Sequence, residues 1–116
     1  ASGGSFMIRV TIYQNEKKEC AGFLAKGHAG FSEAGQDIVC AAASVLMINT
    51  VNAIEAFTDD KTSLVSDDME GLIDFRLADR PGREAALLLK AMILGLETMA
   101  DDSNYSEYIQ VRFEEV

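Results

Sequence analysis

Hydrophobic and polar residues along the chain follow two different spacings, one typical of strands and one typical of helices. Residues 7–13 alternate, with Ile8, Val10 and Ile12 on one face, which predicts a strand that lies half-buried against a core. From residue 37 onward, a long apolar stretch follows helical spacing instead. Over the whole chain, the pattern predicts strands over 7–13 and 20–26, a helix over 37–57, strands over 62–66 and 69–78, a helix over 84–100 and a strand over 105–116.

The order of these elements favours an α+β fold. We expect two layers, a mostly antiparallel sheet with two helices on one face, in the order β-β-α-β-β-α-β. The last strand should direct three apolar side chains inward: Ile109, Val111 and Phe113. A chain of 116 residues forms one domain. We expect that domain to span residues 7–116, with residues 1–6 an expression scar and Met7 the natural start.

Both predicted helices carry more apolar surface than one face of a sheet can cover. Asp37 is a good N-cap for the first helix, because its carboxylate can accept hydrogen bonds from free N–H groups of the first turn. The small side chains of residues 40–44 allow another backbone to approach closely. The surplus apolar surface suggests a homodimer, formed through those small-residue turns or through Leu87, Ala91 and Leu94. Alternatively, the two helices cover each other.

Composition and charge narrow the classes of function. Hydrophobic residues make up 48% of the chain and charged residues 25%, which is typical of a folded protein and not of a disordered one. The net charge of −9 argues against a nucleic-acid partner, since neutralising phosphates requires a basic face. An acidic surface steers a basic partner such as a cationic peptide, although acidity can also serve solubility only.

The chain shows no targeting signal that we recognise. The longest apolar run, residues 38–54, is interrupted by Ser44 and other polar residues, so we expect no membrane span. No secretory signal is evident at the N-terminus, and the predicted location is therefore the cytoplasm. In that reducing compartment, Cys20 and Cys40 are expected to be free thiols.

One stretch, residues 27–44, contains the only histidine, His28, and one of the two cysteines, Cys40. A thiol and an imidazole brought together by a loop are the minimal parts of a cysteine nucleophile and its base. A thiol in the first turn of a helix is stabilised as the thiolate by the helix dipole. The competing interpretation is that Cys40 is a small buried residue among alanines and that His28 is an ordinary loop residue.

Two further residues fit an active site. Ser44 lies one helical turn after Cys40, so its hydroxyl could hydrogen-bond near the thiolate, unless it is only a small residue at a close helix contact. Asp37 lies one turn before Cys40 and could orient the imidazole, although we favour its role as the helix cap. No metal and no other cofactor is expected: His28, Cys20 and Cys40 supply at most three soft ligands without paired spacing, and the glycines form no phosphate-binding pattern.

These residues resemble the signature of the ribosomal-processing cysteine protease family (Prp). The resemblance is carried by Gly27-His28-Ala29-Gly30, followed by Gly35-x-Asp37-Ile38-Val39-Cys40-Ala41-Ala42-x-Ser44, where x is any residue, with an aromatic residue at Phe31. It implies that Cys40 is the nucleophile and His28 the general base, with Asp37 and Ser44 in support. It also implies a loop over the site, which would contain Gly27, Gly30, Phe31 and Gly35.

The same resemblance implies a substrate. Members of the family are homodimeric cytoplasmic endopeptidases of bacteria, which remove the N-terminal extension of a large-subunit ribosomal protein. They cut after a short hydrophobic segment similar to Leu-Gln-Phe-Phe-Ala. Such a substrate is strongly basic, which would give the charge of −9 a use. The alternative from another class is a non-catalytic dimeric module that binds a basic ribosomal or peptide partner.

Overall fold

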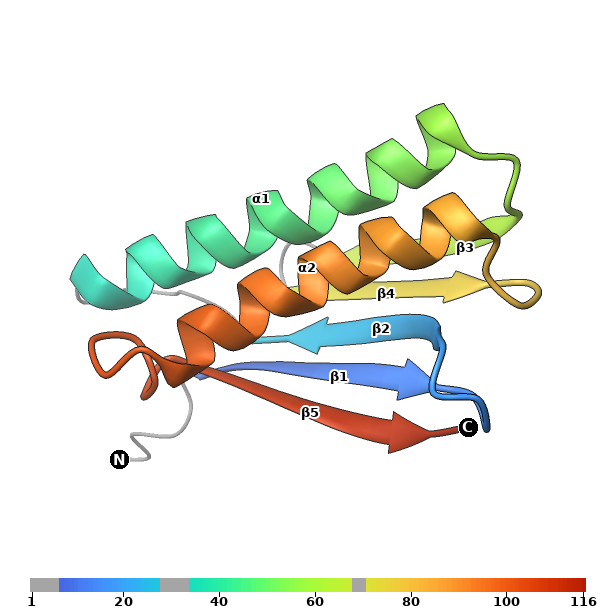
Figure 1. Cartoon of the computed structure of the whole chain (residues 1–116). Helices are drawn as coiled ribbons and strands as arrows, with labels where there is room; N and C mark the ends of the chain where they lie inside the picture. The colour runs from blue at the N-terminus through green and yellow to red at the C-terminus, as the bar shows by residue number, and fades with distance from the viewer. Residues whose placement is uncertain (1–6, 28–33, 68–70) are drawn as a thin grey trace.

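The computed structural model describes residues 7–27, 34–67 and 71–116, and of residues 34–37 only the backbone. Two helices lie side by side on one face of a five-stranded sheet (Figure 1). In chain order the elements are β1 (Ile8–Gln14), β2 (Cys20–Lys26), α1 (Ala34–Phe57), β3 (Thr62–Asp67), β4 (Leu72–Leu77), α2 (Arg83–Asp101) and β5 (Ile109–Glu115). The predicted α+β class, the two layers and the order of elements are therefore confirmed.

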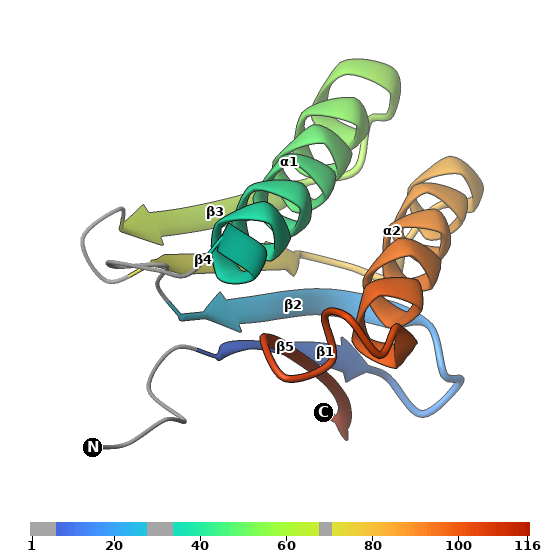
Figure 2. The ribbon, with the colours of Figure 1, turned by 90° about the vertical axis from the view of Figure 1, so that its left-hand side faces the viewer.

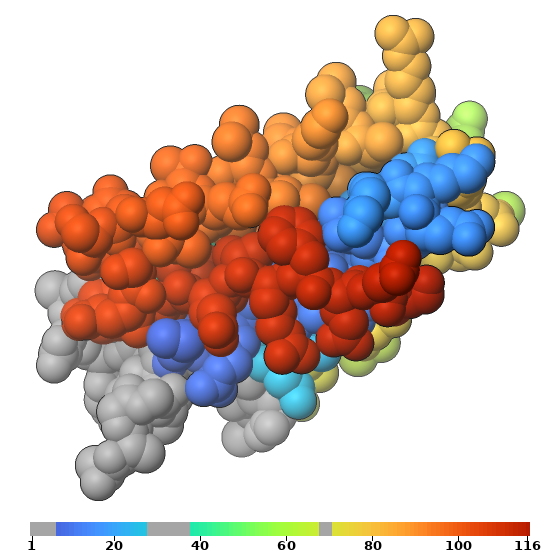
Figure 3. All heavy atoms as spheres, turned by 60° about the horizontal axis from the view of Figure 1, so that its bottom comes forward, coloured from blue at the N-terminus to red at the C-terminus, as the bar shows by residue number. Residues whose placement is uncertain are grey.

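The strands lie in the order β3-β4-β2-β1-β5. All neighbours are antiparallel except β1 and β5, which are parallel because α2 carries the chain back across the sheet before β5 begins. In Figure 3, β5 crosses the lower face of the molecule, and its carboxyl end lies beside the β1–β2 hairpin. There the N–H of Val116 donates to the carbonyl of Gln14 at 2.9 Å.

The core lies between the helical layer and the facing side of the sheet. Val10 pairs with Ala25 and Ile12 with Phe23, so these side chains point toward the helices, as the alternation in β1 predicts. The rings of Phe23 and Phe75 are 5.4 Å apart at the centre of this face. The helices contribute buried apolar side chains from both sides: Val39, Ala43, Met47, Val51 and Ile54 of α1, and Ala85, Leu89, Met92 and Leu96 of α2.

The first helix begins earlier than predicted. Because α1 starts at Ala34, Asp37 lies within the helix, and its assignment as the N-cap is wrong. Nothing in the sequence between Ala34 and Asp37 forbids helix, since alanine and glutamine are good helix formers and a glycine near a helix start is tolerated. Cys40 therefore lies in the second turn and not in the first.

Two differences concern the ends of strands. β4 begins at Leu72 instead of residue 69, directly after Gly71, whose φ of 62° lies in the left-handed region. β5 begins at Ile109 because residues 102–108 form turns, with the N–H of Tyr105 donating to the carbonyl of Asp102. Of its predicted inward residues, Ile109 and Val111 contact the core, but Phe113 is 44% exposed because β5 lies at the edge of the sheet.

One expectation about membranes also changes. The stretch Ile38–Phe57 is long and apolar enough to cross a membrane by length and composition, despite the polar residues within it. Core helices of soluble proteins meet the same criterion, and 33% of this stretch is buried inside the molecule, where its inner side chains share one core with those of the sheet and α2. The finding is therefore weak evidence for a membrane span.

Candidate active site

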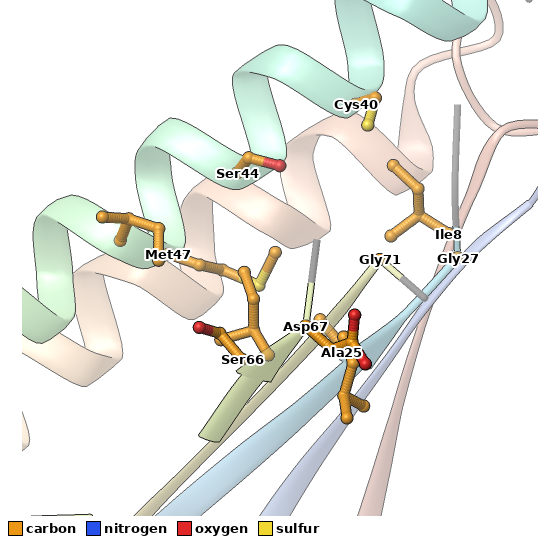
Figure 4. Close-up of a pocket in the computed structure, with 12 residues that line it drawn as sticks. Ile8, Ala25, Gly27, Cys40, Ser44, Met47, Ser66, Asp67 and Gly71 are labelled. Atoms are coloured by element: carbon orange, nitrogen blue, oxygen red, sulfur yellow. The ribbon is translucent and has the colours of Figure 1, made fainter. Parts of the chain in front are cut away.

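Cys40 faces a cavity of about 330 Å³ between α1 and the end of the sheet (Figure 4). Its side chain is half-buried and the thiol is free. Ser44 and Ile48 follow at four-residue intervals along the same side of α1, and the buried side chain of Met47 also lines this wall. The prediction that Cys40 and Ser44 share one face of the helix is confirmed, because both line this one cavity.

The opposite wall comes from strand ends that lie far apart in the sequence. β2 and β3 both run antiparallel to β4. The place where β2 and β3 end and β4 begins is therefore the same end of the sheet. The residues that line the cavity from this side are Ile8, Ala25, Gly27, Ser66, Asp67, Gly71, Leu72 and Ile73. Ser66, Asp67 and Gly71 were not among the predicted site residues, since only the sheet order brings the end of β3 and the start of β4 next to Cys40.

Gly27 lets the chain pass very close to β1 before it reaches His28. Its φ is 134°, and a Cβ atom there would lie 2.6 Å from the carbonyl oxygen of Met7 and 2.7 Å from the Cα of Ile8. A side chain at this position would therefore collide with backbone, which requires glycine. His28, Gly30 and Phe31 lie outside the described residues. Gly27, directly before His28, lines the cavity that holds Cys40.

Gly35 and Asp37 lie in the first turn of α1, and their side chains are outside the described residues. The early start of the helix also changes the electrostatic argument for Cys40. The four N–H groups without a partner inside the helix belong to residues 34–37, one turn before the thiol. Because the effect of the helix dipole falls off within the first turn, it contributes less to a thiolate at Cys40 than the sequence suggested.

The second thiol has a different environment. Cys20 is buried in the core, and its Sγ lies 3.4 Å from the carbonyl oxygen of Gly22. Burial raises the pKa of the Cys20 thiol above its usual value, which disfavours the reactive thiolate. Cys40 is thus the accessible thiol of the two, and both are free, as the sequence predicts.

Comparison with known proteins decides the family. The family model described as "Cysteine protease Prp" matches residues 7–110 of the chain. The chain belongs to the Prp cysteine protease family. A ribosomal processing cysteine protease Prp from Staphylococcus aureus is 35% identical over 107 residues, which cover 92% of this chain and 99% of the relative. The Bacillus subtilis Prp is 31% identical over 109 residues, which cover 90% and 96%.

Solved structures of Prp proteins share the fold. The S. aureus Prp in complex with a substrate peptide matches with a TM-score of 0.86 at 33% identity, covering 93% of this chain and 100% of that one. The same protein with a covalently linked product peptide gives a TM-score of 0.82 at 34% identity with the same coverage. SMU.848 from Streptococcus mutans gives 0.82 at 30% identity, covering 95% and 99%. The chain is therefore a cysteine protease, and the non-catalytic alternative is set aside.

Proposed function

We propose that this Prp protein removes the N-terminal extension of a large-subunit ribosomal protein by cutting after a short hydrophobic segment similar to Leu-Gln-Phe-Phe-Ala. The observation that carries the proposal is the position of Cys40, a free, half-buried thiol at the wall of a cavity large enough for several side chains. The S. aureus relative, a ribosomal processing protease solved with a substrate peptide, supports the substrate class.

The chemistry proposed for the site is that of a cysteine protease. The Cys40 thiolate attacks the carbonyl carbon of the scissile bond, after His28 has taken the thiol proton. His28 then returns that proton to the leaving amine, and water hydrolyses the acyl-enzyme. The N–H groups that α1 leaves unpaired at its start are candidates to hold the oxyanion.

Supporting roles fall to residues around this pair. The Ser44 hydroxyl shares the cavity wall with Cys40, where it can hydrogen-bond near the sulfur. Asp37 is proposed to orient the His28 ring. Gly27, Gly30, Phe31 and Gly35 are proposed to form the loop that covers the bound peptide. The whole catalytic domain is proposed to span residues 7–116.

The acidic character of the protein supports a basic substrate. A net charge of −9 attracts a cationic ribosomal protein and raises its rate of encounter at low salt.

We also propose that the enzyme works in the bacterial cytoplasm as a homodimer, without a nucleic-acid or membrane partner. The exposed apolar residues Leu87 and Leu94 on α2, with Ala91 between them, are the proposed dimer contact.

The test compares Cys40→Ala with Cys20→Ala on a peptide that spans the hydrophobic segment, with cleavage followed by mass spectrometry in reducing buffer. Cys40→Ala should lose activity by at least about 1,000-fold because the nucleophile is removed, whereas Cys20→Ala should retain it within a few-fold. Equal cleavage by wild type and Cys40→Ala, or none by either, would overturn the assignment of Cys40 as the nucleophile.

A second test concerns the base. His28→Ala should change the pH profile of Cys40 alkylation by iodoacetamide, and an unchanged profile would contradict the pairing of His28 with Cys40.

A further inference from the structure

β3 is an edge strand without the usual protection. Among the described residues it pairs with β4 and with no other strand, and its six residues pair without a bulge. It contains no proline and no charge before Asp67, and Leu64 and Val65 are 44% and 59% exposed. The opposite edge, β5, carries Arg112, Glu114 and Glu115. Since charges, prolines and bulges are what normally block pairing at an edge, β3 is open to an added strand.

The register shows which backbone groups of β3 point away from the sheet. The N–H of Ala78 donates to the carbonyl of Lys61 at 2.8 Å, so these two residues form a directly hydrogen-bonded antiparallel pair. Such pairs alternate along the ladder, and therefore Ser63 and Val65 direct their backbone groups toward β4. The alternate residues direct theirs to the free edge: Thr62, Leu64 and Ser66.

The free edge of β3 ends at the cavity that Cys40 lines. β3 runs from Thr62 toward the cavity, and its last two residues, Ser66 and Asp67, form part of the wall opposite Cys40. Figure 2 shows α1 on the β3–β4 side of the helical layer and α2 on the side of β1 and β5. An extended peptide on this edge would therefore lie beside α1.

A second hollow, of about 360 Å³, lies along the flank of α1. It is lined by Ser44, Val45, Ile48, Asn49 and Asn52, and it shares Ser44 and Ile48 with the cavity of Cys40. This flank faces away from α2, because Leu46 on the other side of α1 approaches Gly95 of α2. The cavity of Cys40 thus adjoins the hollow through Ser44 and Ile48, and the free edge of β3 through Ser66.

We propose that the apolar substrate segment before the scissile bond binds as an added strand on the free edge of β3, with alternate side chains in the hollow on α1. This inference rests on the proposed function. Because that segment must present its carboxyl end to Cys40, it runs parallel to β3. Main-chain hydrogen bonds from Leu64 and Ser66 would supply affinity, and the hollow would select every second side chain.

Leu64→Pro tests this pairing, because it removes an outward N–H and keeps the ladder to β4 intact. KM for the peptide should rise at least about 10-fold, the effect of one lost hydrogen bond, while the rate of Cys40 alkylation stays at the wild-type value. Leu64→Ala, which retains the N–H, should show a smaller rise. Glu115→Pro is the matched control on the other edge of the sheet. The N–H of Val116 donates to β1, so the N–H of Glu115 points outward. The KM of this variant for the peptide should equal that of the wild type.

A second measurement uses the wild-type enzyme, so that a misfolded variant cannot decide the result. Substrate peptides N-methylated at one residue at a time should lose affinity at every second residue before the scissile bond, because only alternate N–H groups face β3. A flat profile, or an unchanged KM in Leu64→Pro, would overturn the inference while Cys40→Ala remained inactive. Cleavage by Cys40→Ala would instead overturn the proposed function. A change of oligomeric state in Leu64→Pro with unchanged KM would assign the edge to a second copy and also overturn the inference.

Discussion

Gly22 shows what a single residue contributes to the open face of the sheet. Its φ is 151°, and a Cβ atom there would collide with the carbonyl oxygen of Phe75. Gly22 pairs with Tyr13 on one side and with Arg76 on the other, and it places no side chain between them. The guanidinium of Arg76 lies 4.1 Å from the centre of the Tyr13 ring and binds Asp74 at 2.7 Å. Glycine inside a strand usually weakens it, but at this position the close approach of β4 requires it.

Glu19 and Arg80 form a surface pair that joins the β1–β2 hairpin to the turn before α2. Arg80 donates to the two carboxylate oxygens at 2.7 and 3.0 Å, and Asn15 donates to one of them at 2.9 Å. The hydrogen bond from Arg80 is the largest cause that lowers the pKa of Glu19 from 4.5 to about 2. A lowered pKa in the folded state stabilises the fold above pH 4.5, and this contribution is lost as the pH falls toward 2.

Arg80→Gln should therefore raise the pKa of Glu19 from about 2 toward 4.5, which an NMR titration of the side-chain carboxyl measures directly. The stability of the variant should also fall less steeply between pH 4.5 and 2 than that of the wild type, because less of it depends on this carboxylate. Arg83→Gln removes a nearby positive charge and leaves the bonded pair intact. A pKa that rises equally in both variants would contradict the role given to the hydrogen bonds.

At the scale of elements, neighbouring small residues of α1 lie on different sides of the helix, which the sequence alone does not separate. The small residues 40–44 were expected to allow close backbone approach, but Ala41 and Ala42 are exposed and Ala43 is fully buried. The direction of the helix over the sheet decides this, because neighbouring residues on a helix differ by 100° in direction. Of the three alanines, only Ala43 is buried, in the core that also contains Met47.

Ala43→Leu should destabilise the protein by about 1–3 kcal/mol, because three added carbon atoms must fit into a packed core. Urea unfolding at pH 7 measures the change. Ala42→Leu introduces the same side chain one position earlier on the exposed face and should stay within about 0.5 kcal/mol of wild type. Equal stability of the two variants would show that α1 does not pack as described.

At the scale of the whole molecule, the outer face of the two helices carries large apolar side chains that are exposed in the single chain. Leu87 and Leu94 on α2 are 66% and 67% exposed, and Ile38 and Val45 on α1 are 56% and 68% exposed. The two helices contact one another along their inner sides, which leaves these residues uncovered within one chain. The surplus apolar surface predicted from the sequence is thus real, and a second copy on α2 remains our proposal.

Leu94→Glu should dissociate that dimer, raising its Kd at least about 100-fold, because a symmetric contact places the change in the interface twice. Sedimentation over a range of concentrations measures the Kd. Gln110→Glu adds the same charge on the open face of the sheet and should leave it unchanged. A dimer weakened by Ala42→Glu and not by Leu94→Glu would place the contact on α1 instead.

The sequence by itself determined the order of the elements, the buried face of β1 and the shared face of Cys40 and Ser44. These follow from the two- and 3.6-residue periods, which depend on the local backbone. Only the tertiary structure decided that α1 begins at Ala34, and that the end of β3 and the start of β4 lie opposite Cys40. Such placements depend on strand order and on the packing of elements far apart in the chain, and no local period encodes them. The free edge of β3 beside the thiol is the clearest example.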